Sequence, residues 1–533
     1  METFDYIVVG AGSAGCAVAA RLSEDASCRV LLLEAGGRDD SLLIDMPAGW
    51  GKTQDPRNTF NWAYETEAEP ALGGRCVPLP RGKVLGGSSA INGLLYIRGQ
   101  HEDYDDWDAA GARGWGWRDV APFFERMERN FGIADELHGT DGPIAVSDLA
   151  APSPLSHLLL RAAEQAGIPR TRDFNGVAQE GAGFYQTTML GGRRCSAAHG
   201  YLRPALGRTN LALKTGAAVT DLVMAERRVC GVRYNLGREA HEARARAEVI
   251  LCAGAVATPQ LLMRSGIGPG AALARLGIPV VAEAPDVGAN LQDHLVVPLM
   301  WRLRDGMASM NQRLAGPRVM IEVLDYLLRK RGAMTMPAAE VGVFLRSRPE
   351  LSRPDLQFHA LPLSGELQGK KKALHHFPGF TLAPNVCRPT SRGRIELASP
   401  APSAKPRILM NYLSTDYDIE TTLAGMDWAR RIAAAPALAA VMVGEIYPGA
   451  AAVTRSQLLD YARANGTTGH HPVGTCRMGE DATAVVDSRL RVRGVAGLRV
   501  ADASVMPRLI SGNTNAAAIM IGERASAFLR GGC

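Results

Sequence analysis

The stretch FDYIVVGAGSAGCAVAARLSE, residues 4–24, decides the fold. Its apolar run at 6–9 is rich in β-branched residues, as in a buried parallel strand. Gly10, Gly12 and Gly15 follow in the spacing GxGxxG, and small apolar residues continue from there as a helix would. In such a unit the first glycine permits the tight turn, the second lets the backbone approach a pyrophosphate, and the third lets the helix pack on the strand. The stretch predicts a dinucleotide site with its anion at the helix N-terminus.

The segment that follows supports this interpretation. CRVLLLEAG, residues 28–36, is typical of a second buried strand, and Glu34 ends it. A carboxylate about 20 residues beyond the glycines can accept hydrogen bonds from a ribose diol. An acidic residue there favours an unphosphorylated ribose, so the expected ligand is NAD or FAD rather than NADP.

Composition bounds the class of protein. The chain has 533 residues, 46% of them hydrophobic and 21% charged, which is close to a soluble globular average and sufficient for two or three domains. The formal net charge of +5 is scattered; the basic clusters 329–331 and 370–372 are interpreted as solvated surface rather than a nucleic-acid site. Nine dispersed cysteines without a CxxC pair argue against a disulfide framework and a zinc site.

The start of the chain bears on location. The first residues, METFDYIVVGAG, enter a strand at once, and no apolar run reaches the roughly 18 residues that a membrane span needs. We therefore expect no signal peptide, no transmembrane segment and a cytoplasmic protein. Contact with a membrane through an electron acceptor is left open.

A second glycine-rich loop helps to distinguish between NAD and FAD as the expected ligand. RGKVLGGSSAINGLLYIRG, residues 81–99, contains Gly86, Gly87 and Ser88 in a run of small residues whose N–H groups suit phosphate or ring oxygens. A second cofactor-contacting loop so far from the first favours a long, extended dinucleotide.

At this point the chain resembles the glucose–methanol–choline (GMC) oxidoreductases, an FAD family. The resemblance runs essentially end to end, and its middle part is similar to L-sorbose, aliphatic alcohol and choline dehydrogenases. The motifs that carry it, besides the two loops above, are GAVATPQLLMRSGIGP at 254–269, VGANLQDH at 287–294, HHPVGTCRMG at 470–479 and LRVADASVMPRLISGNTNAAAIMIGERAS at 498–526.

The resemblance implies an α/β and α+β fold with two parts. One is a discontinuous, Rossmann-like FAD-binding domain, and the other is a discontinuous substrate-binding domain with an antiparallel sheet flanked by helices. We expect the first at 1–105, 195–295 and 456–533, and the second at 106–194 and 296–455. Some members attach the flavin covalently through a histidine in the second loop; Ile91 stands at that position here, so we expect non-covalent FAD.

The adjacent His470 and His471 raise three alternatives: a metal site, a structural pair or a catalytic base. Neighbouring side chains point in different directions, and no cysteine or carboxylate cluster lies near them in sequence, so a metal site is not expected. A base that takes a hydroxyl proton needs a pKa near working pH, which suits histidine. The family pattern assigns this role to His471, and it matches Asn515 to the second polar residue that holds the substrate oxygen.

The resemblance also implies which residues contact the cofactor. For four of them a structural alternative stays open: Asn92 as a turn residue, His470 as a packing residue, Asp502 as an N-cap for the terminal helix, and Asn513 as a brace for its loop. The full predicted set is Gly10, Gly12, Ser13, Ala14, Gly15, Glu34, Ala35, Trp62, Arg81, Val84, Gly86, Gly87, Ser88, Asn92, Gly93, Leu94, Val219, Ala253, His470, Asp502, Ala503, Asn513 and Thr514.

The expected activity is therefore FAD-dependent oxidation of an alcohol or polyol to an aldehyde or ketone, with electrons passed to a quinone-like or dye acceptor. An oxygen-using oxidase that makes hydrogen peroxide is the alternative, and a non-redox or photochemical use of the fold is a further one. The sequence does not name the alcohol. Glu340 is a candidate pocket residue, whereas Cys387 and Arg388 are interpreted as structural.

Overall fold

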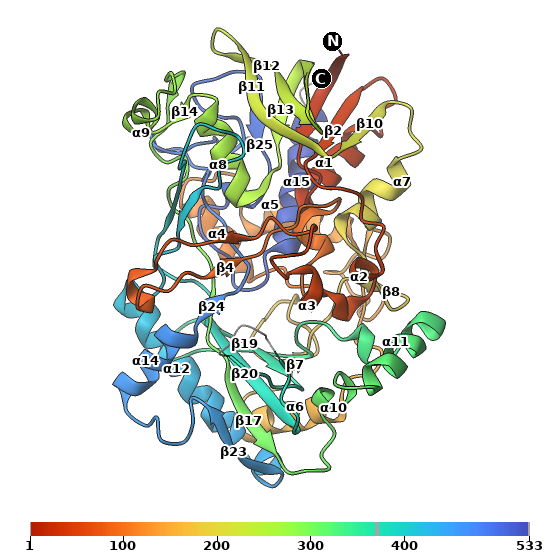
Figure 1. Ribbon diagram of the computed structural model, residues 1–533, viewed down its shortest axis with the longest axis vertical. Coiled ribbons are helices and arrows are strands. Elements are labelled where there is room, and N and C mark those ends of the chain that lie inside the picture. Colours follow the sequence, from red (N-terminus) through yellow and green to blue (C-terminus); the bar gives the residue numbers. More distant parts are fainter. Residues whose placement is uncertain (1, 368–372, 531–533) are drawn as a thin grey trace.

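A parallel sheet forms the upper part of the molecule (Figure 1). Its strands follow the order β10-β2-β1-β13-β12-β11, and β25 pairs with β13. The parallel pairs link β1 to β2 and β13, β2 to β10, and β13 to β25. These strands are β1 (Glu2–Val9), β2 (Val30–Glu34), β10 (Leu211–Thr215), β13 (Glu239–Leu251) and β25 (Leu498–Val500). All five residues of β2 are buried, which accords with the apolar run seen in the sequence.

The same sheet continues as an antiparallel ribbon of β11 (Ala217–Ala225) and β12 (Arg228–Leu236), which pair with each other and with β13. Two helices, α1 (Ser13–Leu22) and α15 (Asn515–Arg530), pack closely beside it. A Cβ at Gly522 would lie 2.5 Å from the carbonyl oxygen of Ala14, so glycine is what permits this approach. The contact brings the N-terminus of α15 to the N-terminus of α1.

An antiparallel sheet forms the lower part of the molecule (Figure 1). The strand order is β23-β17-β20-β19-β18-β7, and β16 joins β20 to β24. Helices α6 (Pro154–Gln165) and α12 (Asp416–Ala433) pack against it. The strands are β7 (Gly181–Phe184), β16 (Leu295–Val296), β17 (Leu299–Leu303), β18 (Val341–Leu345), β19 (Leu356–Leu361), β20 (Gly379–Val386), β23 (Met442–Tyr447) and β24 (Thr467–Thr468).

The remaining elements connect or cover the two sheets. The helices among them are α2 (Leu42–Asp45), α3 (Trp50–Thr53), α4 (His101–Ala109), α5 (Trp117–Met127), α7 (Arg203–Ala205), α8 (Gly254–Arg264), α9 (Gly270–Arg275), α10 (Met310–Arg313), α11 (Arg318–Arg329), α13 (Pro436–Ala439) and α14 (Arg455–Asn465). Short helical turns are η1 (Pro47–Gly49), η2 (Pro70–Leu72), η3 (Gly87–Ala90), η4 (Ala198–Leu202), η5 (Ala333–Thr335) and η6 (Ala503–Val505). Two-stranded pairs join β3 (Tyr64–Glu65) to β4 (Pro78–Leu79), β5 (Glu128–Asn130) to β6 (Ile144–Val146), β8 (Met189–Leu190) to β9 (Arg193–Arg194), β14 (Ile267–Gly268) to β15 (Ala282–Glu283), and β21 (Arg394–Glu396) to β22 (Arg407–Leu409).

This computed structural model describes residues 2–367 and 373–530, so the lysine cluster 370–372 lies outside the described residues. The predicted fold class, with a dinucleotide-type parallel sheet and an antiparallel sheet flanked by helices, is confirmed. The division into two domains at the residues given above stays a prediction. Within the range 106–194, α5 packs against α15 and so lies beside the first sheet. No helix in the described ranges is long and apolar enough to cross a membrane.

Candidate active site

A cavity of about 950 Å³ lies between the two sheets. Loops at the ends of β1, β2 and β13 line one end of it, and strands β17, β19 and β20 line the other. Most of the predicted site residues meet here. Those that line the cavity are Gly10, Gly12, Ser13, Ala14, Glu34, Ala35, Trp62, Arg81, Gly87, Ser88, Asn92, Gly93, Leu94, Val219, Ala253, His470, His471, Asp502, Ala503, Asn513, Thr514 and Asn515.

The N-terminus of α1 opens onto the cavity. Gly12 is its N-cap residue and has no side chain with which to cap the helix, so the first N–H groups remain available to an anion. A Cβ at Gly12 would come no closer than 3.9 Å to Cys252, which leaves the space in front of the helix open. Gly10 has φ +101°, and a Cβ at Gly15 would lie 1.9 Å from the carbonyl oxygen of Gly10. The three glycines therefore have the geometry expected of a pyrophosphate-binding turn.

Glu34 ends β2 at the wall of the cavity. Its Oε2 accepts a hydrogen bond of 2.9 Å from the Ala11 N–H, and its Oε1 accepts one of 2.7 Å from the Gly36 N–H. Burial raises the pKa of this carboxyl to about 7. Each oxygen retains a second lone pair that can accept from a hydroxyl donor. Glu34 can therefore hold the glycine turn and bind a ribose at the same time.

The second glycine-rich loop closes over the first. Gly87 approaches Gly12 so closely that a Cβ on Gly87 would lie 2.7 Å from the Gly12 Cα. Arg81 donates to the Ser88 Oγ at 3.1 Å and to the His470 carbonyl oxygen at 2.9 Å. Its guanidinium thus ties this loop to the segment that carries the two histidines.

Three predicted cofactor-binding residues do not line the cavity and instead support it from behind. Gly15 faces the turn at Gly10, as described above. Val84 is fully buried in a small apolar cluster with Ile44. A Cβ at Gly86 would meet the Ser196 Oγ at 3.2 Å.

Asp502 joins the C-terminal segment to the start of α8. Its Oδ2 accepts hydrogen bonds from the Gly254 N–H at 2.8 Å and the Thr258 hydroxyl at 2.7 Å, and its Oδ1 accepts one from the Ser504 N–H at 2.8 Å. It is the N-cap residue of η6 and it also lines the cavity. The alternative expected from the sequence, an N-cap for the terminal helix, is wrong, because α15 begins at Asn515 and Asp502 caps η6 instead.

His471 has a partner that the sequence motifs did not identify. Antiparallel pairing of β16 with β24, together with a bridge between Gln292 and Val473, places His294 beside His471. The two Nδ1 atoms are 2.9 Å apart, and the His294 Nε2 lies 2.8 Å from the Cys387 carbonyl oxygen. His294 is fully buried and His471 is nearly so.

These contacts fix the proton positions on both rings. A carbonyl oxygen only accepts, so the His294 Nε2 must carry a proton and donate it to Cys387. In the neutral ring the His294 Nδ1 is then an acceptor, and the His471 Nδ1 must be the donor to it. The remaining nitrogen of His471, Nε2, keeps its lone pair, faces the Asn513 Nδ2 at 3.2 Å and can accept a proton.

Electrostatics keep this lone pair available. Burial, with neighbouring His294 as the next cause, lowers the pKa of His471 well below its ordinary value. Burial also lowers the pKa of His294 to about 4 and that of His359 to about 4. All three rings are therefore neutral at neutral pH.

The two asparagines lie at different places around the cavity. Asn515, predicted as the second catalytic residue, begins α15 and accepts a hydrogen bond of 2.8 Å from the Ser13 hydroxyl. Asn513, predicted to contact the cofactor or to brace its loop, has its Nδ2 3.2 Å from the His471 Nε2. The reason is the packing of α15 on α1, which draws the first residue of α15 to the glycine turn and leaves the residue two positions earlier beside His471.

The outer end of the cavity has a largely apolar wall that the sequence analysis did not find. Loop 402–405 also lines the cavity. Among the described lining residues the carboxylates are Glu34 and Asp502, both at the dinucleotide end. The wall at the outer end includes Trp50, Leu95, Val296, Met300, Ala338, His359, Leu361, Leu363, Thr381 and Ala383.

Glu340, the candidate pocket residue, lies outside the cavity lining, and Arg388 and Cys387 make structural hydrogen bonds. Glu340 is not a lining residue of the cavity; its Oε2 accepts a hydrogen bond of 2.8 Å from the Ser153 N–H at the start of α6. Arg388 donates to the Ser511 hydroxyl at 2.7 Å. Cys387 contributes its backbone carbonyl to His294, as described above.

One group of side chains in the described ranges has metal-ligand spacing, Asp135, His138 and Asp173. Both ring nitrogens of His138 already contact carboxylates, Nδ1 with Glu128 at 2.7 Å and Nε2 with Asp173 at 3.1 Å. These contacts raise the pKa of His138 to about 9 even though burial opposes protonation. The group is therefore an ion-pair network around a protonated histidine.

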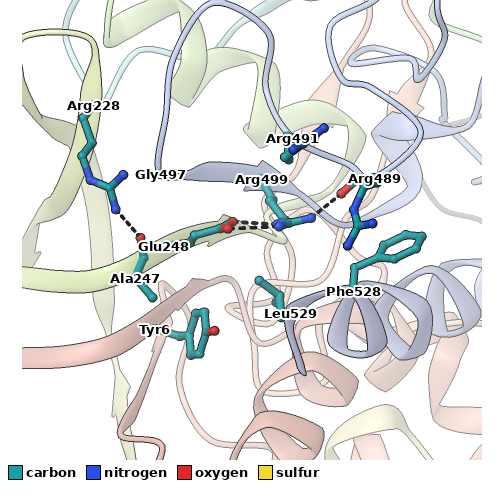
Figure 2. Close-up of a pocket in the computed structure, with 10 residues that line it drawn as sticks. All are labelled: Tyr6, Arg228, Ala247, Glu248, Arg489, Arg491, Gly497, Arg499, Phe528 and Leu529. Carbon is teal, nitrogen blue, oxygen red and sulfur yellow. Dashed lines mark hydrogen bonds and ion pairs between the residues drawn. The ribbon is translucent and has the colours of Figure 1, made fainter. Parts of the chain in front are cut away.

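A second cavity, of about 650 Å³, is rich in arginine (Figure 2). Arg499 pairs with Glu248 at 2.6 Å and donates to the Arg489 carbonyl oxygen at 2.6 Å. Arg491 pairs with Asp487 at 2.8 Å. This cavity shares no lining residue with the first, so it has no part in the candidate site.

Comparison with models of known protein families identifies the family of this chain. A GMC oxidoreductase model matches residues 4–296, and a second GMC oxidoreductase model matches residues 389–522. The chain belongs to the GMC oxidoreductase family. The predicted family and enzyme class are thereby confirmed.

Individual relatives cover the chain almost completely. An alcohol dehydrogenase (acceptor) of Pseudomonas putida is 44% identical over 532 residues, which are 99% of this chain and 95% of that protein. An oxygen-dependent choline dehydrogenase of Ectopseudomonas mendocina is 43% identical over 540 residues, with 99% and 94% coverage. The crystal structure of a pyridoxine 4-oxidase from Mesorbium loti is 32% identical with a TM-score of 0.89, and the match covers 98% of each chain. The resemblance to L-sorbose dehydrogenases stays a prediction.

The neutral buried histidines make stability depend on pH. On unfolding, His294 and His359 return to an ordinary pKa of 6.5, so below that pH the unfolded chain binds protons that the folded chain, with pKa values of about 4, does not. Each should lower the free energy of unfolding by about 2 kcal/mol between pH 7 and pH 5. The measurement is the melting temperature across this range for the wild type and for His359→Gln.

In that series, His359→Gln should give a shallower pH dependence than the wild type. His157→Gln, which removes an exposed histidine, is the matched control and should leave the pH dependence unchanged. An identical slope for the wild type and His359→Gln would contradict the interpretation.

Proposed function

We propose that the protein binds FAD non-covalently in the 950 Å³ cavity and oxidises an alcohol with His471 as the proton acceptor. The observation that carries the proposal is the His471 Nε2, which faces the cavity as an acceptor beside the Asn513 amide. Family membership supports the cofactor, because a solved structure that is 26% identical concerns FAD modification in a formate oxidase.

The residues present fit the cofactor along its length. The N-terminus of α1 and the Gly12–Gly87 contact suit the pyrophosphate, and Glu34 suits the adenosine ribose. Val219 on β11 lines the same end of the cavity and suits the adenine side. Ile91, which lines the cavity where some relatives carry a histidine, offers no nucleophile, so the attachment is non-covalent.

His471 is the group that removes the hydroxyl proton. Its Nε2 accepts the proton while its Nδ1 donates to His294, so the ring gains its positive charge without losing a hydrogen bond. Asp293, whose Oδ1 accepts from the His471 N–H at 2.7 Å, fixes the backbone of this segment. When bound, FAD supplies the acceptor for the hydride that leaves the carbinol carbon.

Asn513 is the group that holds the substrate oxygen. Its Oδ1 accepts a hydrogen bond of 3.1 Å from the Gln357 Nε2, so its Nδ2 must be the end that faces His471. A donor held in this way stabilises negative charge as it develops on the oxygen. Asn513 therefore takes the role that the sequence analysis gave to Asn515.

The substrate is proposed to be a primary alcohol with an apolar chain. The outer wall of the cavity offers Met300, Leu361 and Leu363, and the described carboxylates lie at the dinucleotide end. A quaternary ammonium would instead need aromatic rings with a carboxylate. A polyol would leave hydroxyl groups unpaired against this wall. A quinone-like molecule is proposed as the electron acceptor; the name of the Pseudomonas putida relative specifies an acceptor without identifying it.

His471→Ala should lower the rate of flavin reduction by an alcohol by about 100- to 10,000-fold, because the general base is lost. The protein should stay yellow, since the predicted cofactor contacts are elsewhere. The measurement is anaerobic stopped-flow mixing with a long-chain primary alcohol. Exposed His157→Ala is the matched control and should react as the wild type does.

The same experiment has a pH arm. Because the pKa of His471 lies well below 6.5, its base form persists above that pH, and the wild-type rate should change little from pH 8 to pH 6.5 before it falls in more acid solution. An unchanged reduction rate in yellow His471→Ala would overturn the assignment of the base.

A second comparison separates the two asparagines. Asn513→Ala should lower the reduction rate by about 10- to 100-fold with the flavin retained, because a donor to the developing charge is lost. Asn515→Ala removes the acceptor for Ser13 and should affect flavin retention more than the rate of reduction. The opposite pattern, with a slow Asn515→Ala and an unaffected Asn513→Ala, would restore the assignment made from the sequence.

A further inference from the structure

Helix α11 (Arg318–Arg329) presents an apolar face to solvent. Its five large apolar side chains on this face, Met320, Ile321, Leu324, Leu327 and Leu328, are between 45% and 73% exposed. They recur at i, i+1, i+4, i+7 and i+8, so they share one side of the helix. Single exposed apolar side chains are common on soluble proteins, but a continuous row of five on one helix is not.

The helix is held by a different face. Tyr326 is fully buried in a cluster with Met46 and Met334, and Val319 and Val323 pack at its edge. The exposed row is therefore a separate face of α11 from the one that packs on the protein. In Figure 1, α11 lies at the edge of the molecule, away from both sheets.

Basic residues surround the exposed row. The segment 313–331 contains five basic and two acidic residues. The acidic ones pair with three of the basic ones, Glu322 with Arg313 at 2.7 Å, and Asp325 with Arg329 at 3.1 Å and with Arg331 at 3.3 Å. Arg318 is exposed, and Lys330 follows the end of the helix.

The surface continues onto a neighbouring hairpin. A Cβ at Gly192, in the turn between β8 and β9, would lie 2.0 Å from the Lys330 carbonyl oxygen, so the hairpin abuts the end of α11. Its Leu190 is 41% exposed, and the side chain of Arg193 is 52% exposed. The hairpin thus adds one apolar and one basic side chain beside the row.

We propose that this face of α11 docks on the surface of a membrane that contains anionic lipids. An amphipathic helix with an apolar row, a polar face with arginine and lysine, and no capacity to span a bilayer lies in the plane of the headgroups. The apolar row would enter the acyl boundary, and the basic side chains would contact lipid phosphates.

A second copy of the chain fits this face less well than a membrane does. A two-fold interface on the face would bring the basic flanks of two copies together, and like charges at short range oppose association. Anionic headgroups instead complement the charge. This choice of occupant does not depend on the proposed function.

The location of α11 connects docking with the cavity. The cluster that anchors the helix includes Met46 and, at its edge, Ala48. The chain runs from there into α3, whose first residue, Trp50, lines the outer end of the cavity. A membrane at α11 would therefore lie close to the end of the cavity that accepts an apolar alcohol, a consequence that does rest on the proposed function.

The test is co-sedimentation of the purified yellow protein with phosphatidylcholine vesicles, with and without phosphatidylglycerol. The wild type should sediment with the anionic vesicles, and added salt should weaken this binding because it screens the charges. Ile321→Gln with Leu328→Gln should lower the partition coefficient by at least about tenfold, since two inserted side chains are lost. Both side chains are exposed, so the flavin content and melting temperature should be retained.

The matched control is Val443→Gln with Val453→Gln, which replaces two exposed apolar side chains outside α11, one on β23 and one before α14. It should bind vesicles as the wild type does. The proposal is overturned if the wild type does not sediment with anionic vesicles, or if the α11 variant binds as the wild type does. It is also overturned if the wild type is a dimer in solution that the α11 variant dissociates, because a second copy then covers the face.

Discussion

The hydrogen bond between His294 and His471 is the interaction on which the chemistry of the site depends. A histidine can serve as a base only if the nitrogen that faces the substrate has a lone pair. Here the Cys387 carbonyl fixes the proton on one nitrogen of His294, and that choice fixes the proton on His471. Burial of both rings keeps them neutral, so the arrangement holds at neutral pH. The hydrogen bond to the Cys387 carbonyl thereby favours the arrangement in which the His471 Nε2 faces the cavity as an acceptor.

Both sheets are needed to build this site. The first sheet ends in the glycine turn and in Glu34, which together form the dinucleotide end of the cavity. The second sheet supplies the apolar wall, and the pairing of β16 with β24 aligns the two histidines. Helix α15 joins the halves, because its packing on α1 places Asn513 at the base while Asn515 reaches the glycine turn. In the proposed function, Asn513 therefore holds the substrate oxygen, whereas Asn515 supports the cofactor-binding turn.

The sequence was sufficient to predict the parts of the site that are formed by short continuous motifs. The GxGxxG turn, Glu34 and the second glycine-rich loop lie on the cavity because local spacing determines the turn geometry. His294 lies in a motif that the sequence analysis quoted, but the position of that motif in the chain does not relate it to His471. The two histidines are brought together by the long-range pairing of β16 with β24. The choice between Asn513 and Asn515 depended on the packing of one helix on another, which no motif encodes. The apolar outer wall comes from strands far apart in the chain, and the exposed face of α11 could not be told from a core-facing one by periodicity alone.

The most direct measurement is the absorbance of the bound flavin after anaerobic mixing of the wild-type protein with a panel of alcohols. The panel would contain long-chain and short primary alcohols, benzyl alcohol, choline and L-sorbose. The account predicts that long-chain primary alcohols bleach the oxidised flavin fastest, and that a quinone then restores the colour. A protein that carries no flavin, or a bound flavin that no alcohol in the panel bleaches, would contradict it.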